Sequence, residues 1–347
     1  MREARALADH VRPDPAGGQS HSGGQRLSVE RLKAWQALEY GMFIHFGMST
    51  FDGEEFSAGD RPSTHYAPDK LDVDQWVATA AAAGMRYAVL TAKHVAGHCL
   101  WPTDLTGYHV GTSGNTTDVV EAFVSACQRH GLMSGLYYCS WDNHHLFGSV
   151  PPHRAKAQAA FTTRRYRDFQ LAQIEELLTR YGPIGEVWID IPDVLGADGR
   201  REQYDQIAQL APDAVVVMNA GFRGRWTGSQ PTIEVDKVWP TDVLTIERDL
   251  PPSSAGGYEP WHDLEFSLDD RASCYVPAEV CDPIGAQWFH CDDDPPRSDA
   301  ELLGIRLVCR ERQASLLLNV PPDRHGRIPD SSVSALERLT HHIDKCL

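Results

Sequence analysis

The sequence predicts one α/β domain, a (β/α)8 TIM-like barrel, and three observations support that class. The chain has 347 residues, which is the length expected of a minimal barrel of roughly 250 residues with inserted loops. Short apolar runs alternate with longer stretches of helical character, as parallel strands and their crossover helices do. Polar residues close several of the apolar runs, which is where a barrel keeps its chemistry.

Eight apolar runs are the predicted strands, in chain order 41–45, 86–91, 134–139, 186–190, 214–218, 242–247, 286–290 and 315–319. Several of the helices between them open with Asp or Ser, which cap helix N-termini. The predicted helices are 72–83, 118–131, 155–181, 199–210, 298–312 and 331–345. The irregular stretch 220–285 is rich in Pro, Gly, Trp and charged residues, and we expect it to form loops at the barrel top around strands six and seven.

The first 27 residues contain much Pro, Gly and Ser and lack the apolar core of a secretory signal, so they are predicted to be a flexible N-terminal arm. Residues 28–347 are then the catalytic barrel, without a C-terminal β-sandwich, in a cytoplasmic protein. The net charge of −16 disfavours nucleic acids and anionic membranes as partners and favours a neutral or cationic small ligand. The eight scattered cysteines show no CxxC spacing, which indicates buried thiols rather than a zinc site. Oligomeric state is left open.

Polar residues at the strand ends form the candidate active site. They are His45, Asp190, Glu247, His290 and Asn319, with His94 just after the second strand. Each one alone could cap a strand or bind a loop backbone. Because the C-terminal strand ends of a barrel converge on one mouth, their repetition favours an enzyme.

Asp190 ends the apolar run EVWID, where a carboxylate is costly to desolvate unless it is paired, hydrogen-bonded or used. A cap on the following turn is one interpretation. Glycoside hydrolysis is the other, since it needs one carboxylate as nucleophile and a second carboxyl as acid/base. Candidates for the second group are Glu234, Glu247, Glu265 and Glu279.

Aromatic residues near the predicted mouth fit a sugar ligand, because the C–H faces of sugar rings lie flat on aromatic rings. Most of them could equally belong to the core, and we expect that of Trp288. The set is Trp101, Tyr138, Trp141, Trp188, Trp226, Trp239, Trp261 and Trp288.

Five ordered stretches resemble α-L-fucosidases of glycoside hydrolase family 29, from about Lys33 to the end of the chain. They are YGMFIHFGMSTF (40–51), AGMRYAVLTAKHVAGHCLWPT (83–103), VVEAFVSACQRHGLMSGLYYCSWDNH (119–144), QIEELLTRYGPIGEVWID (173–190) and LLLNVPPDRHGRIP (316–329). The resemblance implies a barrel that hydrolyses terminal α-L-fucosides with retention, without a metal or organic cofactor.

The resemblance also implies roles for individual residues. Asp190 corresponds to the nucleophile, and Glu247 is the first choice for the acid/base, with Glu234 second; Glu279 is instead a structural or supporting acid. The residues implied to contact the sugar are His45, Glu55, Phe56, His94, Tyr138 and Trp188, and Trp101 is added to them from the aromatic set.

The sequence departs from the family pattern at His94-Val95-Ala96-Gly97, where the family shows paired histidines followed by an acid and glycine. One polar contact to the sugar is therefore missing, which leaves open a different deoxy or galacto-configured sugar. A sugar-binding barrel that has lost catalysis is an alternative from another class. A metal hydrolase built on His45, His94, His98 and His290 ranks last, because no HExxH-like spacing supports it.

Overall fold

The computed structural model describes residues 26–145, 160–226, 233–237, 239–251, 266–268 and 272–346. Its centre is a sheet of eight strands in the order β5-β4-β3-β2-β1-β12-β11-β8, in which every neighbouring pair is parallel. The strands are β1 (Tyr40–Ile44), β2 (Tyr87–Lys93), β3 (Met133–Cys139), β4 (Glu186–Asp190), β5 (Val215–Met218), β8 (Leu244–Glu247), β11 (Ala278–Pro283) and β12 (Ser315–Asn319). This is the predicted (β/α)8 barrel.

The barrel is nearly closed, with its seam between β5 and β8. Individual hydrogen bonds join the two sides of the seam in place of a ladder. The Asp242 N–H donates to the Val216 carbonyl at 2.9 Å, and the Ala220 N–H donates to Thr245 Oγ1 at 3.1 Å.

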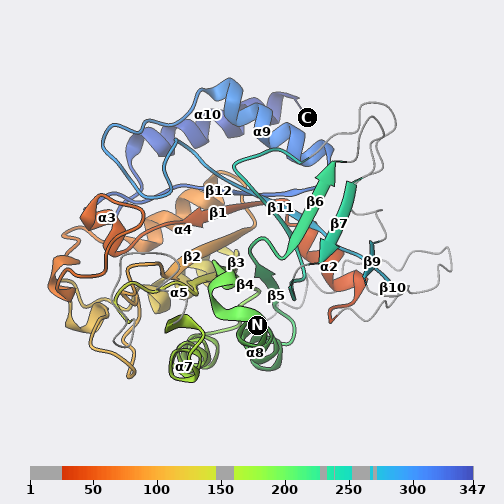
Figure 1. The fold of residues 1–347 in the computed structure, drawn as a ribbon. Coiled ribbons are helices and arrows are strands. Elements are labelled where there is room, and N and C mark those ends of the chain that lie inside the picture. The colour runs from red at the N-terminus through yellow and green to blue at the C-terminus, as the bar shows by residue number, and fades with distance from the viewer. Residues whose placement is uncertain are drawn as a thin grey trace.

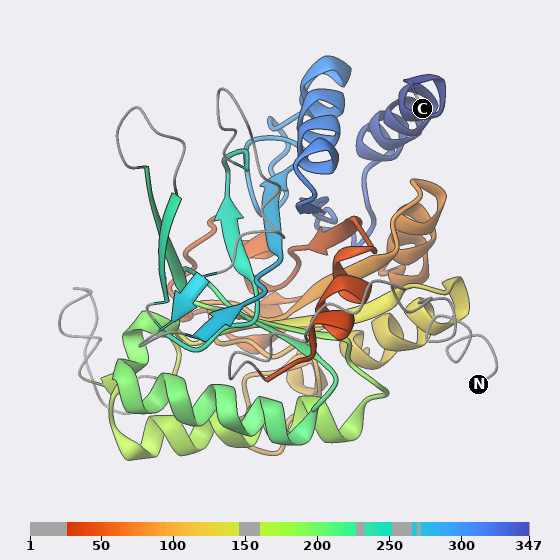
Figure 2. The same ribbon diagram turned by 90° about the vertical axis from the view of Figure 1, so that its right-hand side faces the viewer.

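Helices surround the sheet, with α9 and α10 on one side and α7 and α8 on another (Figures 1 and 2). The six predicted helices are confirmed as α4 (Val73–Ala82), α5 (Val119–His130), α7 (Arg164–Arg180), α8 (Gly196–Leu210), α9 (Asp299–Glu311) and α10 (Asp330–Cys346). Asp72, Asp118 and Ser298 cap three of them through side-chain oxygens, as the sequence indicated. Residues 155–159 of the predicted third helix lie outside the described residues.

Alternate residues of each strand point into the barrel, where they form one apolar cluster. It includes Phe43, Tyr87, Val89, Tyr137, Trp188, Val215, Val217, Cys281 and Leu317. Gly41 leaves room for one large member, because a Cβ there would lie 2.5 Å from the Tyr87 ring. Helix α2 (Val29–Gln36), which the sequence did not predict, inserts Leu32 and Trp35 into the same cluster and covers the N-terminal end of the barrel.

The predicted seventh strand, 286–290, is wrong. The strand at that place in the barrel is β11, and Ala286–His290 form bends and coil beyond it. Glu279 and Asp282 interrupt the apolar run of β11 and conceal it, although both are buried with polar partners. The apolar Trp288 and Phe289 belong to a loop that packs on His45 instead.

The stretch 220–285 contains more regular structure than the predicted loops. Two antiparallel hairpins lie there, β6 (Phe222–Trp226) with β7 (Ile233–Lys237) and β9 (Phe266–Leu268) with β10 (Ala272–Cys274). At the other end of the chain, residues 1–25 of the predicted arm lie outside the described residues, while Leu27 is buried and Arg26 pairs with Asp242. Within the described part of the chain, no helix is both long and apolar enough to cross a bilayer.

Candidate active site

Asp190, at the end of β4, has hydrogen-bond donors on both carboxylate oxygens. The Tyr137 O–H donates to Oδ2 at 2.7 Å. Asn219 Nδ2 and the Ile191 backbone N–H each donate to Oδ1 at 2.9 Å. Burial raises the pKa of Asp190, and these three donors oppose that rise by stabilising the ionised form.

Asn219, directly after β5, connects Asp190 with Glu247. Besides its bond to Asp190, Nδ2 makes a long contact of 3.5 Å to Glu247 Oε2. Its Oδ1 accepts a hydrogen bond from the Thr245 hydroxyl at 3.0 Å, which fixes the orientation of the amide. The two carboxylates therefore face each other across one amide nitrogen at the seam of the barrel.

Glu247, the last residue of β8, differs from Asp190 in its exposure to solvent. Partial desolvation and the nearby charge of Asp190 raise its pKa, while Asn219 and Arg248 oppose the rise. A carboxyl whose pKa is raised keeps a proton to higher pH, as a general acid must.

The residue after each of these three side chains has left-handed backbone. The φ angles are 48° for Ile191, 56° for Ala220 and 54° for Arg248. Non-glycine residues rarely adopt this region, and Ile pays an additional cost as a β-branched residue. The chain therefore turns sharply at the ends of β4, β5 and β8, immediately after Asp190, Asn219 and Glu247.

His45 lies just after β1 and is held in one tautomer. Asn319 Nδ2 donates to the Trp288 carbonyl at 2.8 Å, so its Oδ1 is the acceptor for His45 Nδ1 at 2.8 Å. The His45 Nε2 is then free to accept a hydrogen bond. Burial lowers the pKa of His45 to about 3, so the ring is neutral at ordinary pH.

His94, after β2, lies beside His45 with the ring centroids 5.8 Å apart. It also stacks on Tyr137 at 5.7 Å, which brings it to the Asp190 side of the mouth. Burial, helped by His45 and Lys93, holds the pKa of His94 well below its usual value. The Nδ1 atom is buried without a partner among the described residues. The Val95 that follows is fully buried among apolar residues.

Glu55 is the third carboxylate at the mouth. Its pKa is raised by burial, lowered by Arg248, and raised by the charges of Glu247 and Asp190. Arg248 lies over the Trp288 ring at 4.9 Å and donates to the Ala286 carbonyl at 2.8 Å. Phe56, next to Glu55, is 62% exposed. The structure thus brings Asp190, Glu247, Glu55, His45 and His94 together.

Three predicted sugar contacts lie elsewhere. Trp101 is fully buried, and its indole N–H donates to Glu176 on α7 at 2.8 Å. Tyr138 points out of the barrel toward α7, where its O–H donates to Gln173 at 2.8 Å. Trp188 lies inside the barrel below Asp190, and its N–H donates to Glu279 at 2.9 Å.

Sequence reasoning missed Tyr137 and Asn219, which contact Asp190 directly. Side chains alternate between the two faces of a strand, so Tyr137 and Tyr138 cannot both face inward. Only the pairing of Cys139 with Asp190 shows that Tyr137 shares the face of the nucleophile candidate. Asn219 was one residue beyond the predicted fifth strand, and its place at a strand end was the available signal.

The remaining candidates either lie outside the described residues or have other partners. The side chain of Glu234, on β7, and all of Glu265 and Trp261 lie outside the described residues. His98 binds Ser63 and Ser113 away from the mouth, and His290 lies 3.9 Å from Asp292. Across the residues the structure describes, no three His, Cys, Asp or Glu side chains are arranged to hold a metal ion.

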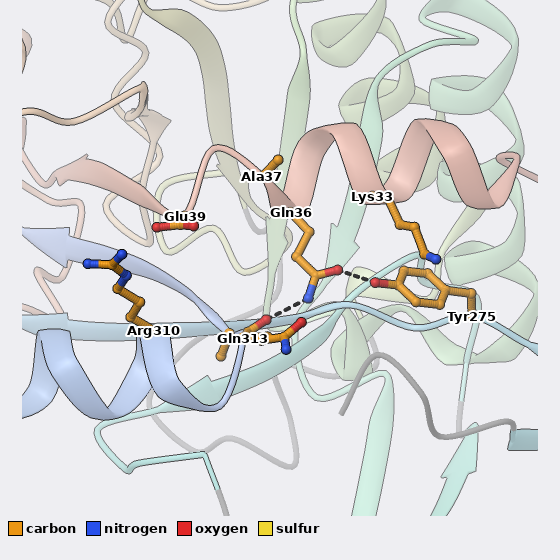
Figure 3. A pocket seen from close by; sticks show the side chains of 8 residues that line it. Lys33, Gln36, Ala37, Glu39, Tyr275, Arg310 and Gln313 are labelled. Carbon is orange, nitrogen blue, oxygen red and sulfur yellow. Dashed lines mark hydrogen bonds between the residues drawn. The ribbon is translucent and has the colours of Figure 1, made fainter. Parts of the chain in front are cut away.

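A cavity of about 380 Å³ lies at the opposite end of the barrel (Figure 3). It is lined by residues that precede β1, β11 and β12, including Lys33, Gln36, Tyr275 and Gln313. The Tyr275 hydroxyl donates to Gln36 there. None of the strand-end residues described above lines this cavity.

The mouth of this (β/α)8 barrel holds facing carboxylates and neutral histidines, and a pair of carboxyl groups is what glycoside hydrolysis uses. The comparisons with known proteins give the family. The α-L-fucosidase family model matches residues 51–346. The chain is 33% identical to α-L-fucosidase 1 of Arabidopsis thaliana over 318 residues, which are 88% of this chain and 58% of that protein. It is also 33% identical to a rice protein described as a putative α-L-fucosidase 1, over 88% of this chain and 56% of the rice protein.

Among solved structures, α-L-fucosidase isoenzyme 1 of Paenibacillus thiaminolyticus superposes with a TM-score of 0.73 at 25% identity, covering 91% of this chain and 75% of that one. The protein therefore belongs to the α-L-fucosidase family, glycoside hydrolase family 29. The chain spans a little over half the length of the two plant relatives.

Proposed function

We propose that the protein hydrolyses terminal α-L-fucosides with retention of anomeric configuration. Asp190 attacks the anomeric carbon and forms a covalent glycosyl-enzyme. Glu247 first protonates the leaving oxygen and then, as a carboxylate, removes a proton from the water that releases the sugar. Family membership and the 33% identity to the Arabidopsis α-L-fucosidase support the choice of substrate.

The contact of Asn219 with both carboxylates is the observation that carries the mechanism. Its Nδ2 lies 2.9 Å from Asp190 Oδ1 and 3.5 Å from Glu247 Oε2, so these two oxygens are no further apart than the sum of the two distances. That limit on the distance between these two oxygens is compatible with the ~5–5.5 Å separation of the carboxyl groups in retaining glycosidases.

The surroundings fit the two roles. Asp190 must be ionised to attack, and it accepts three hydrogen bonds that favour its charged form. Glu247 must carry a proton, and its raised pKa together with its exposure allows exchange with water. Neutral His45 presents a free Nε2 that would accept a hydrogen bond from a sugar hydroxyl.

Azide rescue of alanine variants tests both assignments with an aryl α-L-fucoside. Asp190→Ala should lose turnover by several orders of magnitude and, with azide, give a fucosyl azide of inverted configuration. Glu247→Ala should retain activity only on substrates with good leaving groups, and azide should give the product of retained configuration. Unchanged turnover in Asp190→Ala would remove the proposed nucleophile.

A panel of aryl glycosides tests the sugar. We expect the α-L-fucoside to have the highest kcat/KM. Faster hydrolysis of a galacto-configured or other deoxy glycoside would instead indicate that the missing polar contact at Val95 has changed the sugar specificity. Binding of fucose in calorimetry without turnover of any aryl glycoside would favour a sugar-binding barrel.

A further inference from the structure

Two carboxyl groups face each other at the floor of the barrel, remote from the mouth. Glu186 begins β4, Glu279 lies on β11, and both are fully buried. Burial raises the pKa of both, and that of Glu186 well above its usual value. The negative charge of Glu279 further raises the pKa of Glu186.

Glu279 is the acceptor at the centre of this group. Its Oε1 accepts the Trp188 N–H at 2.9 Å and its Oε2 accepts the Tyr87 O–H at 2.8 Å. Glu186 in turn accepts the Trp35 N–H from α2 at 2.9 Å. A buried carboxylate is expensive to desolvate, and two donors, one from β2 and one from β4, offset part of that cost here.

Trp188 links this group to Asp190. Its ring stacks on Tyr137 with the centroids 5.6 Å apart and the planes 20° from parallel. Phe43 packs against both rings, at 5.5 Å from Trp188 and 5.7 Å from Tyr137. The Tyr137 hydroxyl then donates to Asp190 at 2.7 Å. Three contacts therefore connect a carboxylate at the floor with the carboxylate at the mouth.

We propose that Glu279 is a positioning residue for Asp190, acting through Trp188 and Tyr137. The carboxylate fixes the indole by its N–H, the indole supports the phenol ring, and the phenol holds Asp190 ionised and oriented. This inference rests on the proposed role of Asp190 as the nucleophile. The titratable groups that face Glu279 are Tyr87 on β2, Glu186 on β4 and Cys281 on its own strand.

Glu279→Gln is the first variant, measured as kcat and KM for an aryl α-L-fucoside across pH. The amide keeps one acceptor oxygen where the carboxylate has two, and it carries no charge, so the hydrogen bond from the Trp188 N–H is weakened or lost. We expect kcat to fall about tenfold with KM within about twofold, and the acid limb of kcat/KM to move to higher pH.

Trp188→Phe removes the indole N–H from the other side of the same contact. If Glu279 acts through this bond, the double variant should lose no more activity than the stronger single variant, since contacting residues that act as a unit are not additive. Glu176→Gln is the matched control, because Glu176 accepts the Trp101 N–H in the same way outside the barrel interior. It should leave the pH profile unchanged.

The outcomes separate this inference from the proposed function. Loss of turnover in Asp190→Ala with an unchanged pH profile in folded Glu279→Gln would overturn the positioning role and leave the hydrolase intact. Fully additive losses in the double variant would also overturn it. If Glu279→Gln unfolds, Trp188→Phe alone decides: an unmoved acid limb there would contradict the route through Trp188.

Discussion

The hydrogen bond from Tyr137 to Asp190 predicts how the pH profile responds to loss of one oxygen atom. Tyr137→Phe keeps the ring that stacks on Trp188 and His94 and removes only the donor at 2.7 Å. A hydrogen bond to a charged group contributes about 1.5–3 kcal/mol. At about 1.4 kcal/mol per pKa unit, the pKa of Asp190 should rise by roughly 1–2 units.

The direction in which the acid limb moves follows from the charge that Asp190 must carry. Asp190 attacks as a carboxylate, burial already raises its pKa, and Tyr137 opposes that rise. Without the donor, a higher pH is needed to ionise Asp190, so the acid limb of kcat/KM moves upward. The basic limb, set by loss of the Glu247 proton, should stay in place.

The assay is initial-rate hydrolysis of an aryl α-L-fucoside from about pH 4 to pH 9, because kcat/KM reports the ionisations of the free enzyme. Tyr138→Phe is the control, since this neighbouring hydroxyl donates to Gln173 outside the barrel. It should leave both limbs unmoved. An acid limb that is unchanged or lower in Tyr137→Phe would refute the assigned hydrogen bond or the role of Asp190.

Three further predictions concern the mouth, the strand ends and the barrel floor. Asn219→Ala should lower kcat by about 100-fold, because it removes an amide donor to the reacting carboxylate. A kcat within threefold of the parent's would contradict this. Lys93→Met should cost about 3–5 kcal/mol in urea unfolding, because it removes the buried cation that pairs with the fully buried carboxylate of Asp142. Adding Asp142→Asn removes that charge but keeps an acceptor for the two backbone N–H groups bound to Oδ1, so it should recover most of the loss; a double variant as unstable as the single one would argue against the pair. Glu186→Gln removes a carboxyl whose pKa is raised in the folded state above its usual value of 4.5. As pH rises above 4.5, the parent should therefore lose stability relative to the variant, by at most about 1.4 kcal/mol per pH unit. A stability difference that does not change with pH would show that Glu186 does not keep the proton.

The fold was predictable because seven of the eight strands overlap runs rich in apolar residues, as is typical of strands covered on both faces. The eighth, β11, escaped because Glu279 and Asp282 lie within it. Their burial depends on Trp188, Tyr87 and Arg297, which come from distant parts of the chain. A polar residue in a strand is therefore not evidence against a buried strand when its partners are unknown.

The sequence predicted which strand-end residues meet at the site, but not which side chains along a strand point into the barrel. Asp190, Glu247, His45 and His94 converge because parallel barrel strands end at one mouth, which composition and order alone imply. Choosing Tyr137 over Tyr138 requires the register of β3 against β4, and a single sequence does not contain that register. Trp101 shows the same limit, because its partner Glu176 is 75 residues away.

The three left-handed residues at the mouth explain why turn signals did not mark the site. Ile191, Ala220 and Arg248 are not the glycine or asparagine expected at positive φ, and each sparsely populated conformation costs about 1–3 kcal/mol. At two of these positions the backbone N–H makes a hydrogen bond at the site. The Ile191 N–H donates to Asp190, and the Ala220 N–H donates to Thr245, which orients Asn219. Glycine would remove the strain but widen the range of backbone conformations that follow each reacting side chain. The strain therefore lies where the chemistry needs a fixed direction. The Ile191 N–H binds the adjacent Asp190, whereas the Ala220 N–H has its partner only when β5 and β8 are assembled.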